Sequence, residues 1–371
     1  MGRAETDALR SAEPMPRRTD TMTARPIDAP LRITGLLPRP NDGSLGTRSW
    51  KDAGIRIRCA SIAPHLGALG AAVKLVESQN LDRRIADGSY FDADVFMIYQ
   101  TLEDHRPIVG SLLDAGKCVV VDVCDDLTRY KGVLNYNWEN AQRAFAITVP
   151  TASLARRLAA RVEGKRIYIV PDAVEGEPAP VRPPRREGPL RLFWYGWQHK
   201  LRTLSERLPA LAELAARRPL ELTIMSNLRP VGPILQSIVE SRYDRLSIAA
   251  VPWDLSAFNT AMERSDIAVI PYNESISYSG RSPVRLIQAA WRGRLPVSED
   301  VEGYPEFARF GVLHRSIVDG IAWAVENPDA AAGQLAALQR HVAETHRPEV
   351  LARTWMHALS HAYAGFREQG G

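Results

Sequence analysis

Short apolar runs alternate with helix-like segments along this chain in two separate series, and this rhythm restricts the fold more than any other feature. In the first series the expected strands lie at 31–37, 55–63, 93–99, 117–123, 145–150 and 166–171. Helices are expected between some of them, at 67–76, 108–115 and 153–162. Such alternation is typical of a parallel α/β sheet, because parallel strands need a crossover connection that is usually a helix.

The same rhythm starts again after residue 189. The expected strands of this second series lie at 190–196, 221–226, 245–253, 267–272 and 294–298. A stretch with five prolines in fifteen residues, 175–189, separates the two series and has the composition of an interdomain linker. The sequence therefore predicts an α/β protein of two domains, at 30–174 and 190–345, joined by that linker.

The two ends of the chain differ from the domains. Residues 1–29 are polar, with interleaved charges and several prolines, and we expect a disordered extension there. Residues 346–371 contain an expected helix at 350–366, in which Leu351, Trp355 and Leu359 recur at helical spacing. This helix can pack on its own domain or return to the first domain.

Composition excludes several classes of protein. The chain has 371 residues, of which 45% are hydrophobic and 24% charged, so it is long enough for two buried cores and is not a disordered chain. The net charge of +4 comes without a basic block, so nucleic acid stays open as a partner but is not indicated. The three cysteines lack the spacing of metal ligands, and no apolar segment has the length of a membrane span. We therefore expect a cytoplasmic protein that can also contact the inner membrane face peripherally.

The segment 277–297 has the features of a phosphate-binding helix start. Ser282 is suited to cap a helix, and Pro283 is suited to its first turn. Arg281 and Arg285 add positive charge next to backbone N–H groups that a helix leaves unpaired, and this combination favours an anion such as a diphosphate. The alternative interpretation is an ordinary helix with two solvated arginines.

A second cationic segment follows the strand expected at 190–196. Gly196 allows close backbone approach to a phosphate, and Trp197, His199 and Lys200 come directly after it. Trp253, at the end of another expected strand, can flank a nucleobase or pack in the core. A solvated loop is the alternative for the cationic residues.

Carboxylates gather after the strand expected at 117–123. Asp122, Asp125 and Asp126 can orient hydroxyl groups of a substrate or hold a divalent cation. The alternative is a polar strand end with an aspartate that caps a helix. Spacing alone does not choose between these uses, and we assign no metal ligand.

Four motifs in one order resemble the GT-B glycosyltransferases, in particular the large retaining family 4. The resemblance covers about residues 140–310, and a looser one covers GKCVVVDVCDDL in the first domain. The motifs of the second half are RIYIVPDAV, LRLFWYGWQHK, ERSDIAVIPY and SPVRLIQAAWRGRLPVS. The resemblance implies two Rossmann-like domains that face a cleft, with a nucleotide-sugar donor on the second domain and the acceptor on the first.

The chemistry of these residues predicts their roles in such a transfer. The expected catalytic group consists of Asp125, Asp126, Arg281 and Lys200. Arg281 and Lys200, together with Arg285, would neutralise the departing nucleoside diphosphate, and Asp125 and Asp126 would orient the acceptor. The acceptor can be a glycan, a lipid-linked sugar or a small molecule. The implied chemistry uses the nucleotide sugar as a substrate, with no tightly bound cofactor and no essential divalent cation.

This chain departs from the family pattern at three positions. Gly280 and Gln288 replace two glutamates of the family signature, and Cys124 stands where a histidine is common. Gln288 can still hydrogen-bond a ribose hydroxyl, although an amide is a weaker acceptor than a carboxylate. Two alternatives to sugar transfer therefore stay open: a GT-B epimerase or hydrolase of the same donor, and an inactive nucleotide-sugar-binding protein.

Overall fold

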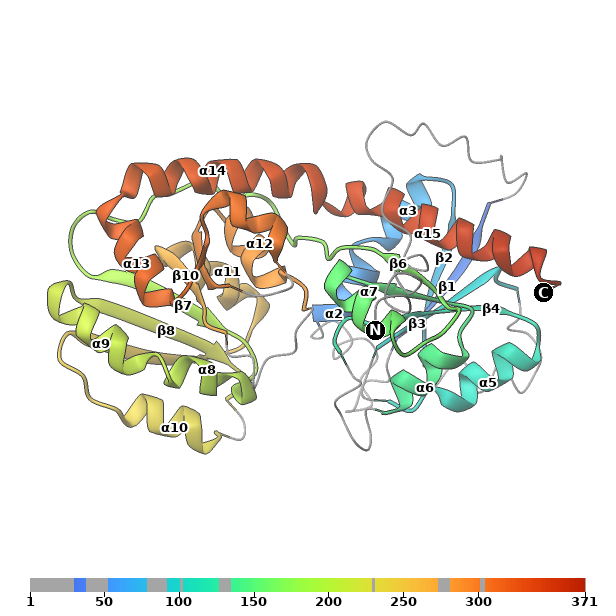
Figure 1. Cartoon of the computed structure of the whole chain (residues 1–371), viewed down its shortest axis with the longest axis horizontal. Helices are drawn as coiled ribbons and strands as arrows, with labels where there is room; N and C mark the ends of the chain where they lie inside the picture. The colour runs from blue at the N-terminus through green and yellow to red at the C-terminus, as the bar shows by residue number, and fades with distance from the viewer. Residues whose placement is uncertain are drawn as a thin grey trace, which may run out of the picture. The chain divides into compact units, whose positions relative to one another are not determined.

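The computed structural model describes residues 30–37, 53–78, 92–100, 103–126, 135–228, 231–272, 281–300 and 304–370. The chain divides into two compact units, each built around one sheet (Figure 1). The first unit comprises Met1–Ala173, Gly280–Ser282 and His346–Gly371, and the second comprises Val174–Ser279 and Pro283–Thr345. The expected extension at 1–29 lies outside the described residues.

The first unit contains a six-stranded sheet in the order β2-β1-β3-β4-β5-β6, and every neighbouring pair is parallel. Its strands are β1 Arg32–Leu37, β2 Ala72–Glu77, β3 Val95–Tyr99, β4 Cys118–Asp122, β5 Ala146–Val149 and β6 Arg166–Ile169. Its helices are α2 Ala53–Ile55, η2 Arg56–Ala60, α3 Ala63–Ala68, α5 Arg106–Asp114, α6 Asn135–Arg143, α7 Ala152–Ala159 and α15 Pro348–Glu368. The predicted parallel α/β sheet is confirmed for this unit.

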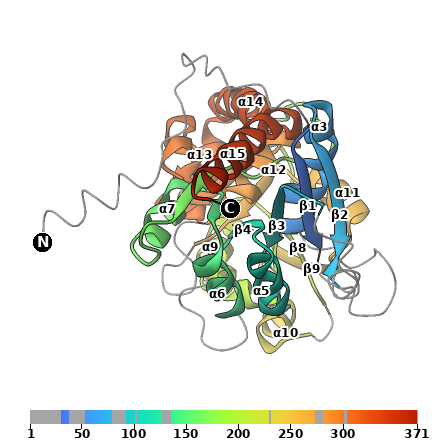
Figure 2. The same ribbon diagram turned by 90° about the vertical axis from the view of Figure 1, so that its right-hand side faces the viewer.

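Helices cover both faces of the first sheet. Leu112, Ala141 and Leu158, from α5, α6 and α7, are buried in the core on one face. Trp355 and Leu359 of α15 are buried in the core on the other face, where α15 and α3 lie side by side (Figure 2). The C-terminal helix is therefore part of the first unit and closes its hydrophobic core.

Two predictions for the first unit are wrong. The strand expected at 55–63 is helical, and the helix expected at 67–76 is replaced by α3 and β2. The buried residues Ile55, Cys59, Ile62 and Leu66 share one core and recur at the spacing of a helix. The alternation of Ile and Arg resembles the pattern of a strand, but Arg58 is buried together with the apolar residues of this segment.

The second unit also contains six parallel strands, in the order β12-β11-β10-β7-β8-β9. Its strands are β7 Leu190–Tyr195, β8 Leu220–Ser226, β9 Leu246–Pro252, β10 Ile267–Ile270, β11 Leu295–Glu299 and β12 Leu313–His314. Its helices are η4 Gln198–Lys200, α8 Leu201–Ser205, α9 Leu208–Arg217, α10 Pro233–Glu240, α11 Leu255–Arg264, α12 Val284–Trp291, η5 Pro305–Phe310, α13 Ile317–Glu326 and α14 Pro328–Thr345. All five strands expected in this half are confirmed.

The proline-rich stretch 175–189 runs along the second unit instead of forming a free spacer. The backbone N–H of Ala179 donates to Trp291 O at 3.0 Å, and that of Arg182 donates to Gly293 O at 3.1 Å. A side-chain contact also holds the stretch, because Arg185 Nε lies 2.6 Å from Asp266 Oδ2. Its prolines therefore stiffen a strap that is fixed to the end of α12, to Gly293 and to Asp266.

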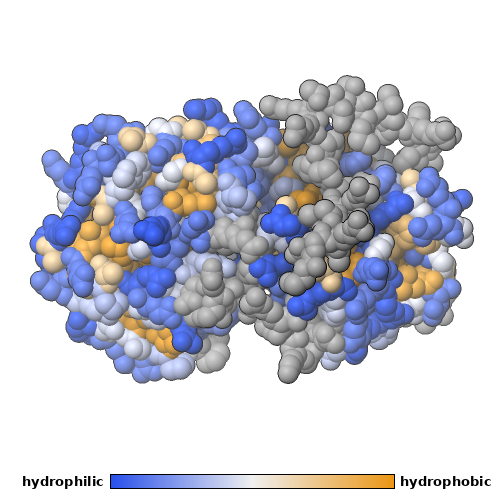
Figure 3. Space-filling view, in the orientation of Figure 1, coloured by the Kyte–Doolittle hydropathy of each residue, from blue (hydrophilic) through white to orange (hydrophobic). Residues whose placement is uncertain are grey.

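Hydrophilic residues cover most of the coloured surface in Figure 3, with small apolar patches between them. Among the described residues, the large hydrophobic side chains that are most exposed include Trp197 and Val231, at 58% and 56%. No helix in the described part of the chain has both the length and the apolar character needed to cross a membrane.

Candidate functional site

Helix α12 begins one residue later than expected at the predicted phosphate site. Pro283 occupies the capping position, and its carbonyl accepts the N–H groups of Leu286 and Ile287 at 2.8 and 3.0 Å. The expectation that Ser282 caps the helix is therefore corrected, because proline holds that place and has no polar side chain. The expected burial of Leu286, Ile287 and Ala290 is confirmed.

The end of β7 and the first turn of α12 contact each other through Tyr195 and Arg285. Tyr195 Oη donates to Arg285 O at 3.4 Å, and Arg285 Nη1 lies 3.5 Å from Tyr195 O. Burial raises the pKa of the Tyr195 hydroxyl, while the Arg285 charge lowers it and the Glu175 charge raises it. The two segments predicted to be cationic are thus brought together, since Gly196 follows Tyr195 directly.

The backbone of Gly196 has a different use from the predicted one. Its N–H donates to Met225 O at 3.1 Å, and its carbonyl accepts from Ser226 Oγ at 2.7 Å. Both groups therefore tie the turn to β8, and this N–H is not directed at a phosphate. A Cβ at this glycine would lie 3.3 Å from the Trp194 ring and 3.9 Å from Lys200 Cδ, so Lys200 packs closely over the turn.

The remaining residues predicted on this loop differ in exposure. Trp197 and His199 are exposed, and Lys200 is half-buried at the end of η4. Lys200 N donates to Trp197 O at 2.9 Å, which closes the short 3-10 turn. The loop can thus present an ammonium and an imidazole next to the Tyr195 and Arg285 contact, a combination suited to an anion.

Trp253 lies after β9 with 38% of its surface exposed. Its ring meets Phe258 edge-on at 5.6 Å, and Phe258 in turn lies 4.8 Å from the Tyr195 ring. One part of Trp253 is therefore fixed against the core while the other is accessible. The geometry agrees with both alternatives from the sequence, a packed tryptophan and an aromatic surface for a base.

Gln288 is 5% exposed and does not present a free amide. Its Oε1 accepts the backbone N–H of Glu175 at 2.9 Å, and its Nε2 donates to the carbonyl of the same residue at 3.0 Å. The amide thus pairs with both polar groups of one residue of the strap. The predicted contact between Gln288 and a ribose would have to replace this pairing.

The predicted carboxylates separate into different environments. Arg281 belongs with the first unit, where its Nε lies 3.1 Å from Asp125 Oδ1. Asp125 is partly exposed, and Asp126 is 4% exposed. The first unit therefore holds Arg281, Asp125 and Asp126, whereas Arg285 belongs to the second unit, so Arg281 and Arg285 do not share one unit as the sequence suggested.

Asp122 is part of a buried ion pair. Its two oxygens accept Arg58 Nε and Nη2, both at 2.7 Å, and Thr148 Oγ1 donates to it at 2.6 Å. Arg58 also contacts Asp172 at 2.5 Å. Burial alone would lower the pKa of the Arg58 guanidinium, but these two carboxylates raise it above its usual value. Asp122 therefore stabilises the core of the first unit. Its prediction as a carboxylate that binds substrate or a cation is corrected.

Sequence reasoning missed Tyr195 and Glu175, which contact the predicted site residues Arg285 and Gln288. Both stand next to a feature that was recognised, since Tyr195 precedes Gly196 and Glu175 opens the proline-rich stretch. No local pattern connects either residue with α12. Within the described ranges, no group of three or more His, Cys, Asp and Glu side chains is arranged to bind a metal ion.

No protein family matches this sequence, and no curated protein sequence is detectably similar to it. Solved structures, in contrast, are similar over most of the chain. HepE of Anabaena, solved in complex with UDP and glucose, has a TM-score of 0.60 at 13% identity, over 89% of this chain and 99% of its own. A glycosyltransferase from Rickettsia africae has a TM-score of 0.62 at 10% identity, over 90% and 98% of the two chains.

A third similar structure belongs to a different class of enzyme. The putative UDP-N-acetylglucosamine 2-epimerase from Listeria monocytogenes has a TM-score of 0.52 at 11% identity, over 88% of this chain and 94% of its own. Identities this low establish the architecture alone. Two six-stranded parallel sheets with flanking helices, in the arrangement shared with these structures, give this protein the GT-B fold.

Proposed function

We propose that the protein transfers a sugar from a nucleotide-diphosphate sugar to an acceptor. The observation that carries this proposal is the contact between Tyr195 and Arg285, which joins the loop after β7 to the start of α12. Lys200 and Arg285 then lie on two segments that meet at the carboxyl edge of the second sheet. Ligands of open parallel sheets bind beyond this edge, and two cationic groups there suit a diphosphate.

In the proposed mechanism, Arg285 and Lys200 stabilise the negative charge that develops on the departing nucleoside diphosphate. His199 adds a further polar group, and Trp253 offers an aromatic surface to the base. Electrostatic stabilisation of a leaving group requires charges that are fixed before the reaction. Arg285 meets this requirement, because its guanidinium and its carbonyl both contact Tyr195.

The acceptor is proposed to bind the first unit, where Asp125 and Asp126 follow β4. These carboxylates can accept hydrogen bonds from hydroxyl groups, and Arg281 holds Asp125 in place. Retention of the anomeric configuration and membership in family 4 are part of the proposal and derive from the motif order. UDP is the first nucleotide to test, because HepE was solved with it.

Calorimetric titration with UDP and with uridine tests the proposal through the Arg285→Ala variant. The variant should lose about 1.5 to 3 kcal/mol of UDP binding free energy, since a charge-assisted hydrogen bond disappears. Uridine binding should stay unchanged, because the nucleoside has no phosphate for the arginine. Arg191→Ala is a matched control, as Arg191 lies at the opposite end of β7 and pairs with Glu221 at 3.0 Å.

An equal loss for UDP and uridine in Arg285→Ala would contradict the assignment of the diphosphate site. The second candidate function is epimerisation of a nucleotide sugar, favoured by the similarity to the Listeria structure. Incubation with UDP-N-acetylglucosamine and UDP-glucose, followed by chromatography, separates the two. Sugar transfer releases UDP and extends an acceptor, whereas epimerisation gives a new nucleotide sugar without UDP.

A further inference from the structure

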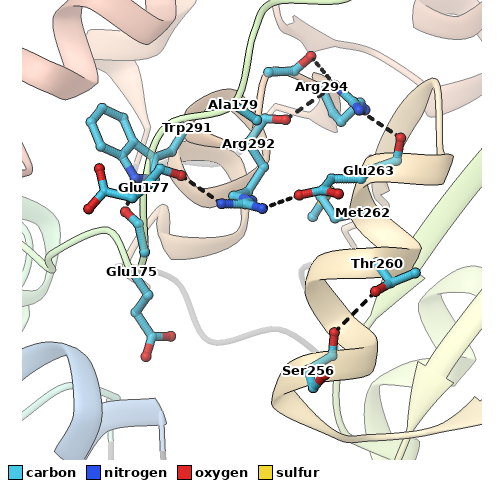
Figure 4. Close-up of polar contacts among 12 residues, drawn as sticks. Glu175, Glu177, Ala179, Ser256, Thr260, Met262, Glu263, Trp291, Arg292 and Arg294 are labelled. Carbon is cyan, nitrogen blue, oxygen red and sulfur yellow. Dashed lines mark hydrogen bonds and ion pairs between the residues drawn. The ribbon is translucent and has the colours of Figure 1, made fainter.

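The strap is held to α12 by side chains that bind its successive carbonyl groups. Gln288 binds Glu175, as described above, and Trp291 Nε1 donates to Gly176 O at 2.6 Å. Arg292 Nη1 donates to Glu177 O at 2.6 Å (Figure 4). Three consecutive residues of the strap are thus fixed by three side chains of one helical end, so the backbone of Glu175 has a defined position.

This position lies close to the proposed diphosphate site. Gln288 and Arg285 are three residues apart on α12 and therefore share one helix face. The backbone of Glu175 sits against Gln288, about one helical turn from Arg285. In Figure 4 the Glu175 side chain extends away from Trp291 and Arg292, which hold the strap.

The influence of Glu175 on the pKa of Tyr195 agrees with this placement of its carboxylate. Burial is the largest influence on the pKa of the Tyr195 hydroxyl, and the Glu175 charge is among the groups that raise it further. The hydroxyl of Tyr195 donates to Arg285 O at 3.4 Å. The carboxylate therefore acts on the same tyrosine that joins β7 to α12.

We propose that Glu175 binds a hydroxyl group of the nucleotide-sugar donor and that Gln288 is the positioning residue that holds it there. The inference rests on the proposed function. A carboxylate accepts stronger hydrogen bonds from hydroxyl groups than an amide does, and Gln288 already uses both ends of its amide on Glu175. In this proposal Glu175 determines the preference of the protein for a donor that carries the contacted hydroxyl group, on the ribose or on the transferred sugar.

The hydroxyl group can belong to the ribose or to the transferred sugar, and binding assays distinguish these sources. The ribose is tested with UDP against its 2′-deoxy and 3′-deoxy forms, and the sugar is tested with UDP-glucose against UDP. In wild type, the ligand that carries the contacted hydroxyl should bind about 10- to 100-fold more tightly, the factor expected for a charge-assisted hydrogen bond. Glu175→Gln should reduce this preference by about tenfold.

Glu177→Gln is the matched control, because it removes a carboxylate from the same strap at an exposed residue whose carbonyl, not its side chain, is held by Arg292. This variant should keep the preference for the hydroxylated ligand. Gln288→Ala should lower it as Glu175→Gln does, and the double variant should show no further loss, because both changes act on one contact. A structural role alone would lower the melting temperature without changing this preference.

The outcomes separate the inference from the proposed function. UDP binding that depends on Arg285, together with an unchanged hydroxyl preference in Glu175→Gln, overturns the inference and leaves the proposed function intact. Absence of binding of UDP, GDP and ADP to the wild-type protein overturns both. Loss of the preference in Glu175→Gln but not in Glu177→Gln supports the inference, and the ligand pair affected identifies the ribose or the sugar.

Discussion

Replacement of Gln288 by glutamate tests whether this residue holds the strap or reads a nucleotide. The family signature would favour the substitution, because it restores the expected carboxylate. The structure predicts the opposite result. An introduced carboxylate could still accept the N–H of Glu175, but it could not donate to the Glu175 carbonyl, which Gln288 Nε2 now contacts at 3.0 Å.

The magnitude of the effect follows from this lost donor. A buried carbonyl without a partner costs about 1 to 3 kcal/mol, and burial of a carboxylate at a site that is 5% exposed in wild type adds to that cost. We therefore expect Gln288→Glu to be destabilised by about 2 kcal/mol or more at pH 8. A loss of 2 kcal/mol corresponds to a fall in melting temperature of about 4 to 8 °C for a domain of this size.

The loss of stability in Gln288→Glu should depend on pH. Next to a carbonyl oxygen the neutral form of the introduced carboxyl is more stable than the charged form, so its pKa in the folded state should be higher than in the unfolded state. The protonated form can donate to the Glu175 carbonyl. The difference in stability from wild type should therefore be small below about pH 4, where the group is protonated in both states, and should grow as the pH rises.

Thermal unfolding of wild type, Gln288→Glu and Gln288→Met at several pH values from about 4 to 8 measures these effects. Gln288→Met keeps the size of the side chain but removes both hydrogen bonds, so its loss should not depend on pH. A melting temperature of Gln288→Glu equal to or above wild type at pH 8, together with tighter UDP binding, would refute the pairing with Glu175. That result would place the side chain at the nucleotide.

Two further substitutions test the parts of the fold that support the site. Gly293→Ala should destabilise by more than about 2 kcal/mol, since φ is +66° and a Cβ would lie 2.1 Å from Pro180 O; in Gly333→Ala, with no atom near the new Cβ, melting should stay unchanged or rise. Asp122→Asn should cost about 3 to 5 kcal/mol in denaturant unfolding, because it breaks the buried pair with Arg58. A cost below about 1 kcal/mol for either substitution would contradict these packing arguments.

The strands of this protein could be predicted because they are buried on both faces. Strands such as β4 and β10 then read as continuous apolar runs, which are visible without knowledge of their neighbours. The prediction for 55–63 was wrong because burial in this segment depends on distant residues. Arg58 is buried through its pairs with Asp122 and Asp172, which lie 64 and 114 residues away in the chain, and no local pattern shows these pairs.

The candidate site was predictable to the extent that its chemistry lies on single segments. Gly196 to Lys200 and Arg285 could be found from composition and spacing, and both follow strands that the sequence also predicted. The contact between Tyr195 and Arg285 could not be found, because 90 residues separate them. Local patterns identify which groups are present, and the order of strands in the sheet decides which of them meet.

Gln288, which stands where the resembled family has a glutamate, pairs with the backbone of another glutamate, Glu175. Judged by the signature alone, the missing carboxylate suggests a weakened or inactive site. The structure gives the amide a task that a carboxylate cannot perform, because one residue of the strap offers both a donor and an acceptor. Glutamine matches that pair, and the residue it holds is itself a glutamate. If Glu175 binds the donor, the carboxylate that the family signature places on the helix is supplied here by the strap. The glutamine at position 288 and the glutamate at position 175 then depend on each other, because the first holds the second.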